Sequence, residues 1–353
     1  MAYYTLRNLM SRLYDERGRQ LPADVSSEQA YAQWKIAARK KLTEITGIEI
    51  LASLPQVPLN PVMLEETACD GYKRQTWLIQ TMQDVQMPFY LLMPNSPNGA
   101  AILNPHGHGG GRDGTIGNED NPAVKEMRER FPDRGTITFA VEAAQKGYIV
   151  ACPDAVGSGE RREKGQQGDD AAQCRSNSHR EINQMGLGFG ISAIGLMVFE
   201  LMKLADFLLT LPQVDPKRIG ALGMSGGGQQ TIYLAALDDR ISAAVTSGYF
   251  YGFKEALLFR PANCSCNFLP HIWETLDMGD FGALIAPRAF LVESGRLDHL
   301  NGEPGIDNVI PQIDIARSAF TLFGCEEKLV HSIHGEGHKY IGTDVFPFFE
   351  KWL

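Results

Sequence analysis

The sequence of 353 residues lacks several features that would place it in a special class of protein. No apolar run approaches the ~20 residues needed to cross a bilayer. The longest candidate, residues 191–211, is interrupted by Glu200, Lys203 and Asp206. The N-terminus reaches Arg7 without the apolar segment of a secretory signal. No internal repeat or low-complexity segment stands out. These absences predict a cytoplasmic globular protein with no membrane partner.

Strong charge and metal-binding cysteine spacing are also missing. A net charge of −9 argues against nucleic acid or anionic membranes as main partners. None of the six cysteines forms a CxxC pair, so the spacing does not match a zinc ribbon. Cys264 and Cys266 are too close in sequence for an ordinary disulfide with each other. The cysteines are therefore expected to be mostly reduced, which fits the cytoplasm.

What the sequence does contain is an alternation of short apolar strands and helices. Strands are expected at residues 76–82, 87–93, 100–103, 148–152, 218–222, 242–246, 289–293 and 328–333. Helices are expected at 139–146, 189–209, 229–237 and 313–323. This pattern is typical of the α/β class, with a mostly parallel sheet covered by helices on both faces. The first two strands flank Gln83-Asp84 and predict an antiparallel hairpin at the sheet edge.

The chain is expected to form one main domain with additions. Residues 1–60 predict a helical extension that packs on the core, and residues 61–353 predict the α/β domain. Two long stretches, 157–188 and 248–285, do not fit the bare scaffold, and connections of this length are usually functional or disordered. The second is rich in aromatic residues and is expected to cover a pocket.

A glycine-flanked serine lies between a predicted strand and a predicted helix. The segment reads Gly223-Met224-Ser225-Gly226-Gly227. A sharp strand-to-helix turn exposes a serine hydroxyl above the sheet, and crowding in the turn favours small flanking residues. Ser225 is therefore the predicted nucleophile. An ordinary glycine-rich turn is the alternative.

A second glycine-rich loop follows the strand at 100–103 and reads His106-Gly107-His108-Gly109-Gly110-Gly111. Acyl transfer develops an oxyanion, which is stabilised by backbone N–H groups. We expect these donors at Gly226 and at His108, with Gly109 as the fallback. A phosphate-binding loop is disfavoured because no GK[ST] follows. A His-x-His metal site would need further ligands.

An acid and a base follow the serine in chain order. Asp298 comes after one predicted strand and His338 after the last one, so both are expected at the carboxyl edge of the sheet. His338 could take the proton of the serine while Asp298 holds the imidazole. Asp298 could instead be a surface carboxylate. Glu293 is a rival acid, expected within its strand, and His331 and His334 are rival bases.

These segments together resemble the α/β-hydrolase superfamily, nearest its acetyl xylan esterase-like and dienelactone hydrolase-related branch. The resemblance rests on the two glycine-rich segments already quoted, on Pro153-Asp154-Ala155-Val156-Gly157-Ser158-Gly159-Glu160, and on residues 71–74, 87–94, 285–288, 296–298 and 337–338. It runs from about residue 65 to the C-terminus. It implies Ser225, Asp298 and His338 as nucleophile, acid and base. Dienelactone hydrolases use a cysteine nucleophile, so lactone specificity does not carry over.

The expected activity is therefore serine-dependent hydrolysis of a carboxylic ester, through an acyl-enzyme and without a metal or organic cofactor. The resemblance implies a small acyl group such as acetyl, on a small-molecule ester. A homo-oligomer is compatible with these features. One alternative is a serine peptidase of the prolyl-oligopeptidase type, although the usual β-propeller repeats are missing. A non-catalytic hydrolase-like binding protein is the other.

Overall fold

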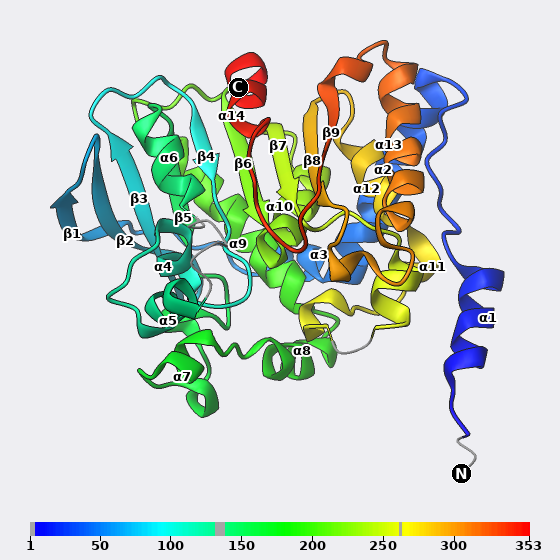
Figure 1. Cartoon of the computed structure of the whole chain (residues 1–353), viewed down its shortest axis with the longest axis horizontal. Coiled ribbons are helices and arrows are strands. Elements are labelled where there is room, and N and C mark those ends of the chain that lie inside the picture. The colour runs from blue at the N-terminus through cyan, green and yellow to red at the C-terminus, as the bar shows by residue number, and fades with distance from the viewer. Residues whose placement is uncertain (1–3, 131–137, 261–262) are drawn as a thin grey trace.

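The computed structural model describes residues 4–130, 138–260 and 263–353 (Figure 1). Residues 1–3 of the predicted extension and 261–262 of the second predicted insertion lie outside the described residues, as do 131–137. A nine-stranded sheet has the order β1-β2-β3-β5-β4-β6-β7-β8-β9. The strands are β1 (Val62–Ala68), β2 (Tyr72–Met82), β3 (Val85–Pro94), β4 (Ala101–Leu103), β5 (Ile149–Pro153), β6 (Ile219–Met224), β7 (Ile241–Ser247), β8 (Ala289–Gly295) and β9 (Leu329–His334).

The sheet is mostly parallel, as predicted. Neighbouring strands from β5 to β9 run parallel, whereas β1 with β2, β2 with β3 and β3 with β5 are antiparallel. The predicted hairpin between β2 and β3 is confirmed, and Asp84 in its turn has φ 60°. Because parallel strands end at one edge, the loops after β4, β6, β7, β8 and β9 meet there.

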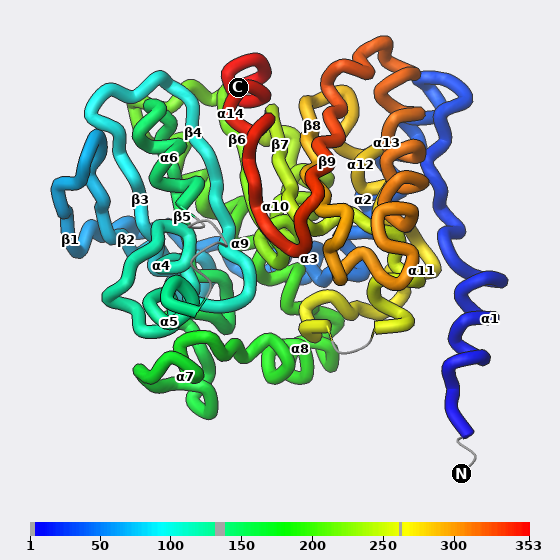
Figure 2. Tube along the Cα trace, viewed as in Figure 1, coloured from blue at the N-terminus to red at the C-terminus, as the bar shows by residue number. Residues whose placement is uncertain are grey.

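Helices connect and cover the strands (Figure 2). They are α1 (Arg7–Arg17), α2 (Glu28–Thr46), α3 (Ile48–Ser53), α4 (Gly111–Ile116), α5 (Pro122–Arg130), α6 (Phe139–Gln145), α7 (Ala171–Arg175), α8 (His179–Leu187), α9 (Ala193–Leu208), α10 (Gly226–Leu237), α11 (Ile272–Thr275), α12 (Met278–Ile285), α13 (Ile310–Leu322) and α14 (Val345–Trp352). Among the described residues, none of these helices is long and apolar enough to span a membrane.

Two apolar clusters lie on the two faces of the sheet. Side chains alternate along each strand, so Leu103 joins the larger cluster while its neighbour Ile102 joins the smaller one. The larger cluster receives α2, α9, α10, α12 and α13, and the smaller receives α6 and α14. Helices on both faces of a mostly parallel sheet confirm the predicted fold class.

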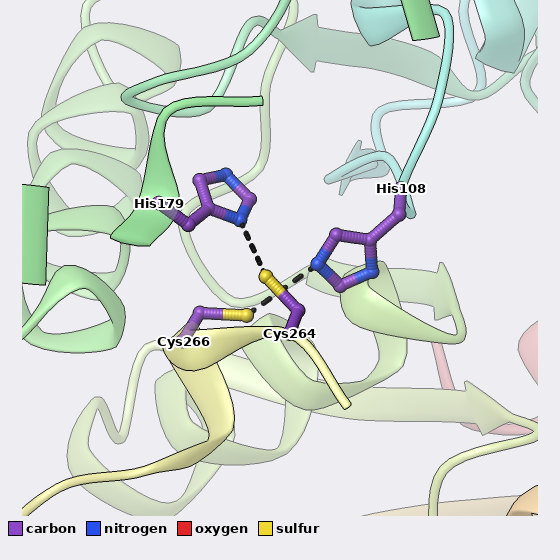
Figure 3. A group of neighbouring side chains, drawn as sticks. All are labelled: His108, His179, Cys264 and Cys266. Atoms are coloured by element: carbon purple, nitrogen blue, oxygen red, sulfur yellow. Dashed lines mark hydrogen bonds between the residues drawn. The ribbon is translucent and has the colours of Figure 1, made fainter. Parts of the chain in front are cut away.

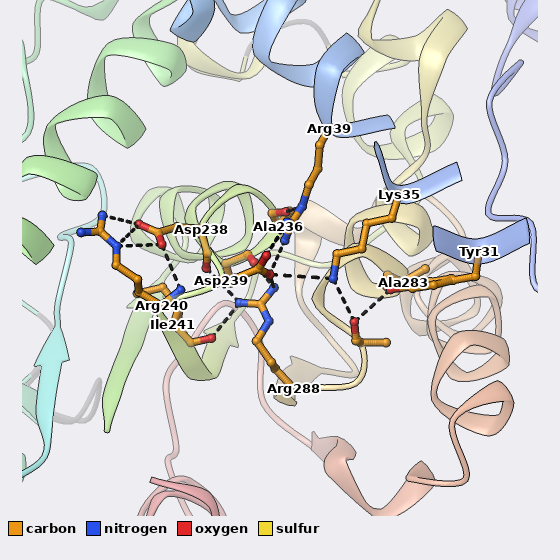
Figure 4. A network of polar contacts seen from close by, with 12 residues as sticks. Tyr31, Lys35, Arg39, Ala236, Asp238, Asp239, Arg240, Ile241, Ala283 and Arg288 are labelled. Carbon is orange, nitrogen blue, oxygen red and sulfur yellow. Dashed lines mark hydrogen bonds and ion pairs between the residues drawn. The ribbon is translucent and has the colours of Figure 1, made fainter. Parts of the chain in front are cut away.

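The N-terminal helices differ in how firmly they pack. No residue of α1 is buried, and Figure 2 shows α1 projecting along one side of the molecule. In contrast, α2 is capped by Ser27 and buries Tyr31 and Trp34. Arg39 of α2 binds both carboxylate oxygens of Asp239, at 2.7 and 2.6 Å (Figure 4). The α2 helix is therefore joined to the core by packing and by ion pairs.

The two predicted insertions contain short helices rather than strands. Residues 157–188 include α7 and α8, and residues 248–285 include α11 and α12. Phe250, Tyr251 and Phe253 are each 1% exposed and pack in the larger cluster, so these aromatic residues do not form an outer cover. All six cysteines are free.

Candidate active site

Ser225 occupies the turn between β6 and α10. Its backbone has φ 56° and ψ −121°, a conformation that L-residues seldom adopt, and its amide donates to the Ser247 carbonyl at 2.8 Å. A Cβ on Gly223 would lie 2.2 Å from the Gly227 carbonyl oxygen, so the turn has no room for a side chain there. The predicted strand-turn-helix context of Ser225 is confirmed.

Asp298 and His338 are hydrogen-bonded to each other after β8 and β9. The distance from His338 Nδ1 to Asp298 Oδ2 is 2.8 Å, and the Asp298 side chain is only 1% exposed. Its other oxygen accepts the Leu300 amide at 2.8 Å. A carboxylate can only accept, so Nδ1 of His338 carries the proton and Nε2 is left as the acceptor.

Gly248 links the turn that carries Ser225 to the hydrogen-bonded pair of Asp298 and His338. Ser247, which binds the Ser225 amide, directly precedes Gly248. A Cβ on Gly248 would lie 3.0 Å from His338 Cε1 and 3.3 Å from Asp298 Oδ2. Within the described part of the chain, the Ser225 hydroxyl makes no hydrogen bond. The structure thus brings Ser225, His338 and Asp298 to one sheet edge, with no hydrogen bond between Ser225 and His338 among the described residues.

The loop after β4 passes directly beside Ser225. A Cβ on Gly107 would lie 3.5 Å from Ser225 Cβ and 3.8 Å from the Gly226 nitrogen, and the His108 ring faces Gly226. His106 anchors this loop, because its Nε2 accepts the Ala155 amide at 3.0 Å while Nδ1 donates to the Gly107 carbonyl. Burial lowers the pKa of His106, so the ring stays neutral. Both predicted oxyanion positions therefore lie next to the serine.

The rival acid and bases have other partners. Glu293 lies within β8, as expected, and accepts the Ser247 hydroxyl and the amides of residues 341 and 342. His331 contacts the Ser294 hydroxyl at 3.1 Å, and burial lowers its pKa to about 4. His334 accepts the amide of residue 336. Glu293 thus holds the loop that follows His338, and His338 has the acid partner expected of a base.

Sequence reasoning missed three residues that gather around His108 (Figure 3). His179 comes from α8, Cys264 directly precedes the 3-10 turn at residues 265–267 of the second insertion, and Cys266 lies within that turn. His179 Nδ1 lies 3.2 Å from Cys264 Sγ, and His108 Nε2 lies 3.4 Å from Cys266 Sγ. The Cys-x-Cys pair was a visible signal, but its histidine partners lie far away in sequence.

Comparisons with known proteins agree with this architecture. The model of the Abhydrolase family matches residues 19–301. YtaP of Bacillus subtilis (strain 168), named as a hydrolase, is 26% identical over 286 residues, which cover 79% of this chain and 88% of YtaP.

Solved structures share the fold at low identity. A Bacteroides fragilis NCTC 9343 protein assigned as an acetyl xylan esterase has a TM-score of 0.75 at 20% identity. The match covers 95% of this chain and 83% of the Bacteroides fragilis chain. A glucuronoyl esterase from Solibacter usitatus has a TM-score of 0.66 at 14% identity, covering 92% and 93%. The family match and the sheet topology together establish that the chain belongs to the Abhydrolase family and has an α/β-hydrolase fold.

Proposed function

We propose that the protein is a serine-dependent carboxylic ester hydrolase. The observation that carries this proposal is the 2.8 Å hydrogen bond between Asp298 and His338, at the sheet edge where Ser225 is presented on a strained turn. Such a pair orients an imidazole for general base catalysis. The esterase names of the solved structures with this fold support ester chemistry.

The proposed reaction proceeds through an acyl-enzyme. Ser225 Oγ attacks the ester carbonyl while its proton moves to Nε2 of His338. The N–H groups of Gly226 and His108 bind the oxyanion. The alcohol leaves with the proton from His338, and Ser225 retains the acyl group. Water then gives a proton to His338 and attacks the acyl carbonyl. His338 returns this proton to Ser225 Oγ as the ester bond to the serine breaks, which releases the acid and restores the free enzyme.

For the substrate we propose an ester of a carbohydrate with a small acyl group, such as an acetylated sugar. The names of the solved relatives support this class, because both denote esterases and one names acetyl xylan. The short loops beside Ser225 are also compatible with a small acyl group, since Gly107 and Gly226 lie against it.

The proposal is tested with Ser225→Ala and a panel of p-nitrophenyl esters, acetylated sugars and aminoacyl amides. We expect wild-type turnover of acetyl esters and at least a ~10³-fold loss of kcat in the variant. Ser318→Ala, on α13, is the matched control and should keep wild-type activity. A fluorophosphonate should label wild type and not Ser225→Ala.

Three outcomes would count against the proposal. Full esterase activity in Ser225→Ala would exclude Ser225 as nucleophile. Turnover of aminoacyl amides without turnover of esters would instead favour a peptidase. If folded wild type neither turns over a substrate nor takes up the fluorophosphonate, the protein is a non-catalytic member of the family.

A further inference from the structure

Two histidines and two cysteines from three distant segments form a tight cluster. His108 lies on the loop after β4, His179 begins α8, and Cys264 and Cys266 belong to the second insertion. Their nearest nitrogen and sulfur atoms all lie within 4.8 Å of one another. His179 and Cys266 are buried, Cys264 is half-buried and His108 is exposed. None of these four side chains takes part in the proposed hydrolysis. His108 contributes to it only through its main-chain N–H group.

We propose that His108, His179, Cys264 and Cys266 bind one zinc ion. Two imidazole nitrogens and two thiolates are a ligand set that Zn²⁺ favours. With Zn–N bonds of about 2.0–2.1 Å and Zn–S bonds of about 2.3 Å, tetrahedral ligand atoms lie roughly 3.3–3.8 Å apart. The His179–Cys264 and His108–Cys266 distances of 3.2 and 3.4 Å are close to this spacing. Small side-chain rotations bring the remaining pairs into range.

A small cavity beside the cluster has room for an ion but not for an organic ligand. Its volume is about 10 Å³, about that of one water molecule, and His108, His179 and Cys266 line it, whereas Cys264 does not. The exposed edge of His108 gives the ion a route from solvent. Binding releases the two thiol protons to solvent, so two thiolates and Zn²⁺ carry no net charge in this mostly buried place.

Polar groups around the cluster are placed to orient its ligands. His179 presents Nδ1 to the cluster, and its other nitrogen lies 3.1 Å from the hydroxyl of the buried Ser158. Asn267, which accepts the Tyr249 hydroxyl at 2.6 Å, points its amide at Cys266 Sγ from 3.9 Å. An outer partner on the second nitrogen is what zinc-binding histidines almost always have.

The site would be structural, because four protein ligands leave no open coordination position. It would fasten residues of both insertions to the loop after β4. That loop passes beside Ser225, and the His108 ring lies against Gly226. The zinc would therefore fix the main chain that supplies one proposed oxyanion donor. The metal site is independent of the proposed hydrolysis, since its occupancy is measured without any substrate.

The test is the metal content of the full-length protein purified without chelator, measured by mass spectrometry. We expect about one zinc per chain in wild type. Cys264→Ser and His179→Gln should weaken zinc binding by at least the ~10- to 100-fold that loss of an outer partner costs. Cys69→Ser and His271→Gln remove a cysteine and a histidine outside the cluster and should keep wild-type affinity.

If a ligand variant fails to fold, Ser158→Ala still tests the proposal, because this variant leaves all four ligands in place. It should lower zinc affinity about 10-fold or more, measured by competition with a chromophoric chelator. Cobalt(II) titrated into chelator-treated wild type should produce the visible absorption of a tetrahedral thiolate site. Zinc binding that is equally tight in Cys264→Ser and Cys69→Ser would overturn the proposal. So would wild type that takes up neither zinc nor cobalt.

Discussion

The hydrogen bond between Asp298 and His338 determines which ring nitrogen of His338 can accept a proton. Asp298 is held by two contacts, since one oxygen binds the Leu300 amide and the other binds His338 Nδ1. With Asp298 1% exposed, water does not compete for the bond, which makes it stronger than it would be at the surface. The imidazole is therefore fixed in the tautomer whose Nε2 can accept a proton.

Replacing Asp298 by Asn should lower kcat for acetyl esters by about 10³- to 10⁴-fold, because the amide can donate to Nδ1 and so stabilise the wrong tautomer. Steady-state kinetics with p-nitrophenyl acetate measure the loss. Asp307→Asn changes a nearby exposed carboxylate and should have no effect. More than a tenth of wild-type kcat in Asp298→Asn would contradict the assignment.

The predicted site residues can be placed from local sequence patterns, whereas the missed residues come together only through contacts between distant parts of the sequence. Ser225, Asp298 and His338 each follow a recognisable strand, so local patterns place them at one sheet edge. His179 is the first residue of α8 and Cys264 precedes a short 3-10 turn, both within insertions where no element was predicted, and only the folded chain brings them to His108. The missing CxxC excluded a zinc ribbon but could not exclude a site assembled from three distant segments.

At the level of elements, the C-terminal end of α10 depends on a side chain from the segment before β8. The last carbonyl groups of a helix have no partners within it. Arg288 donates to the carbonyl oxygens of Ala235, Asp238 and Ile241 at 2.5, 2.9 and 2.7 Å (Figure 4). One guanidinium thus joins the helix that follows Ser225 to the start of β7.

We expect Arg288→Met to lower the free energy of unfolding by about 2 to 4 kcal/mol, because charge-assisted bonds to buried carbonyls are lost and the carbonyls stay unpaired. Urea denaturation followed by circular dichroism measures the change. Arg12→Met is the control, since the Arg12 side chain is 66% exposed and its loss should cost little. Equal midpoints for the two variants would show that Arg288 does not support α10.

Strand β9 contains a half-buried histidine, His331, that makes folding sensitive to acid. Burial lowers the pKa of His331 to about 4, with Arg317 acting in the same direction. The unfolded chain therefore binds more protons below an ordinary pKa of about 6.5, so stability should fall as the pH drops from about 6.5 towards 4. For this partly exposed ring the loss is at most about 3 kcal/mol.

The check is urea denaturation of wild type and His331→Gln between about pH 4.5 and 7.5. The variant should lose stability less steeply in acid than wild type. His271→Gln, at an exposed position, should keep the wild-type slope. If His331→Gln and wild type respond identically to pH, the pKa of His331 is the same in the folded and unfolded chain, which would contradict this account.

Buried strands were predictable and the exposed edge was not. The eight predicted strands are present because each contributes apolar residues to a buried sheet. Strand β1 was missed: six of its seven residues are exposed, so no alternation of apolar and polar residues marks it. Among the residues that the structure describes, β1 pairs only with β2, and backbone hydrogen bonds rather than side-chain burial define it.

At the scale of the whole molecule, a buried ion pair connects the first insertion to the helix layer and the sheet. Arg161 binds Glu200 of α9 through two contacts of 2.5 and 2.7 Å, and Thr81 of β2 donates to the same carboxylate. The side chains of Arg161 and Glu200 are 8% and 2% exposed. Glu200 interrupts an otherwise apolar helix in the sequence, and this pairing explains its presence there.

Arg161→Met should destabilise the protein by about 3 to 5 kcal/mol, because it leaves the Glu200 carboxylate buried without a counter-charge. The double variant Arg161→Met/Glu200→Met should recover most of that loss, since it removes both charges. Chemical denaturation of the three variants, with Glu200→Met included, gives the coupling energy. A double variant less stable than Arg161→Met alone would contradict this account.

The unusual backbone of Ser225 has a consequence for how this protein can evolve. A residue at φ 56° and ψ −121° costs of order 1–3 kcal/mol, and glycine would escape most of that cost. Selection for folding stability alone would therefore favour glycine at position 225. Accordingly, Ser225→Gly should unfold at a higher urea concentration than wild type. If the Ser225 hydroxyl is the nucleophile, as proposed, stability and activity favour different residues at this position. Relatives that no longer catalyse the reaction should then be the ones that lose the serine first.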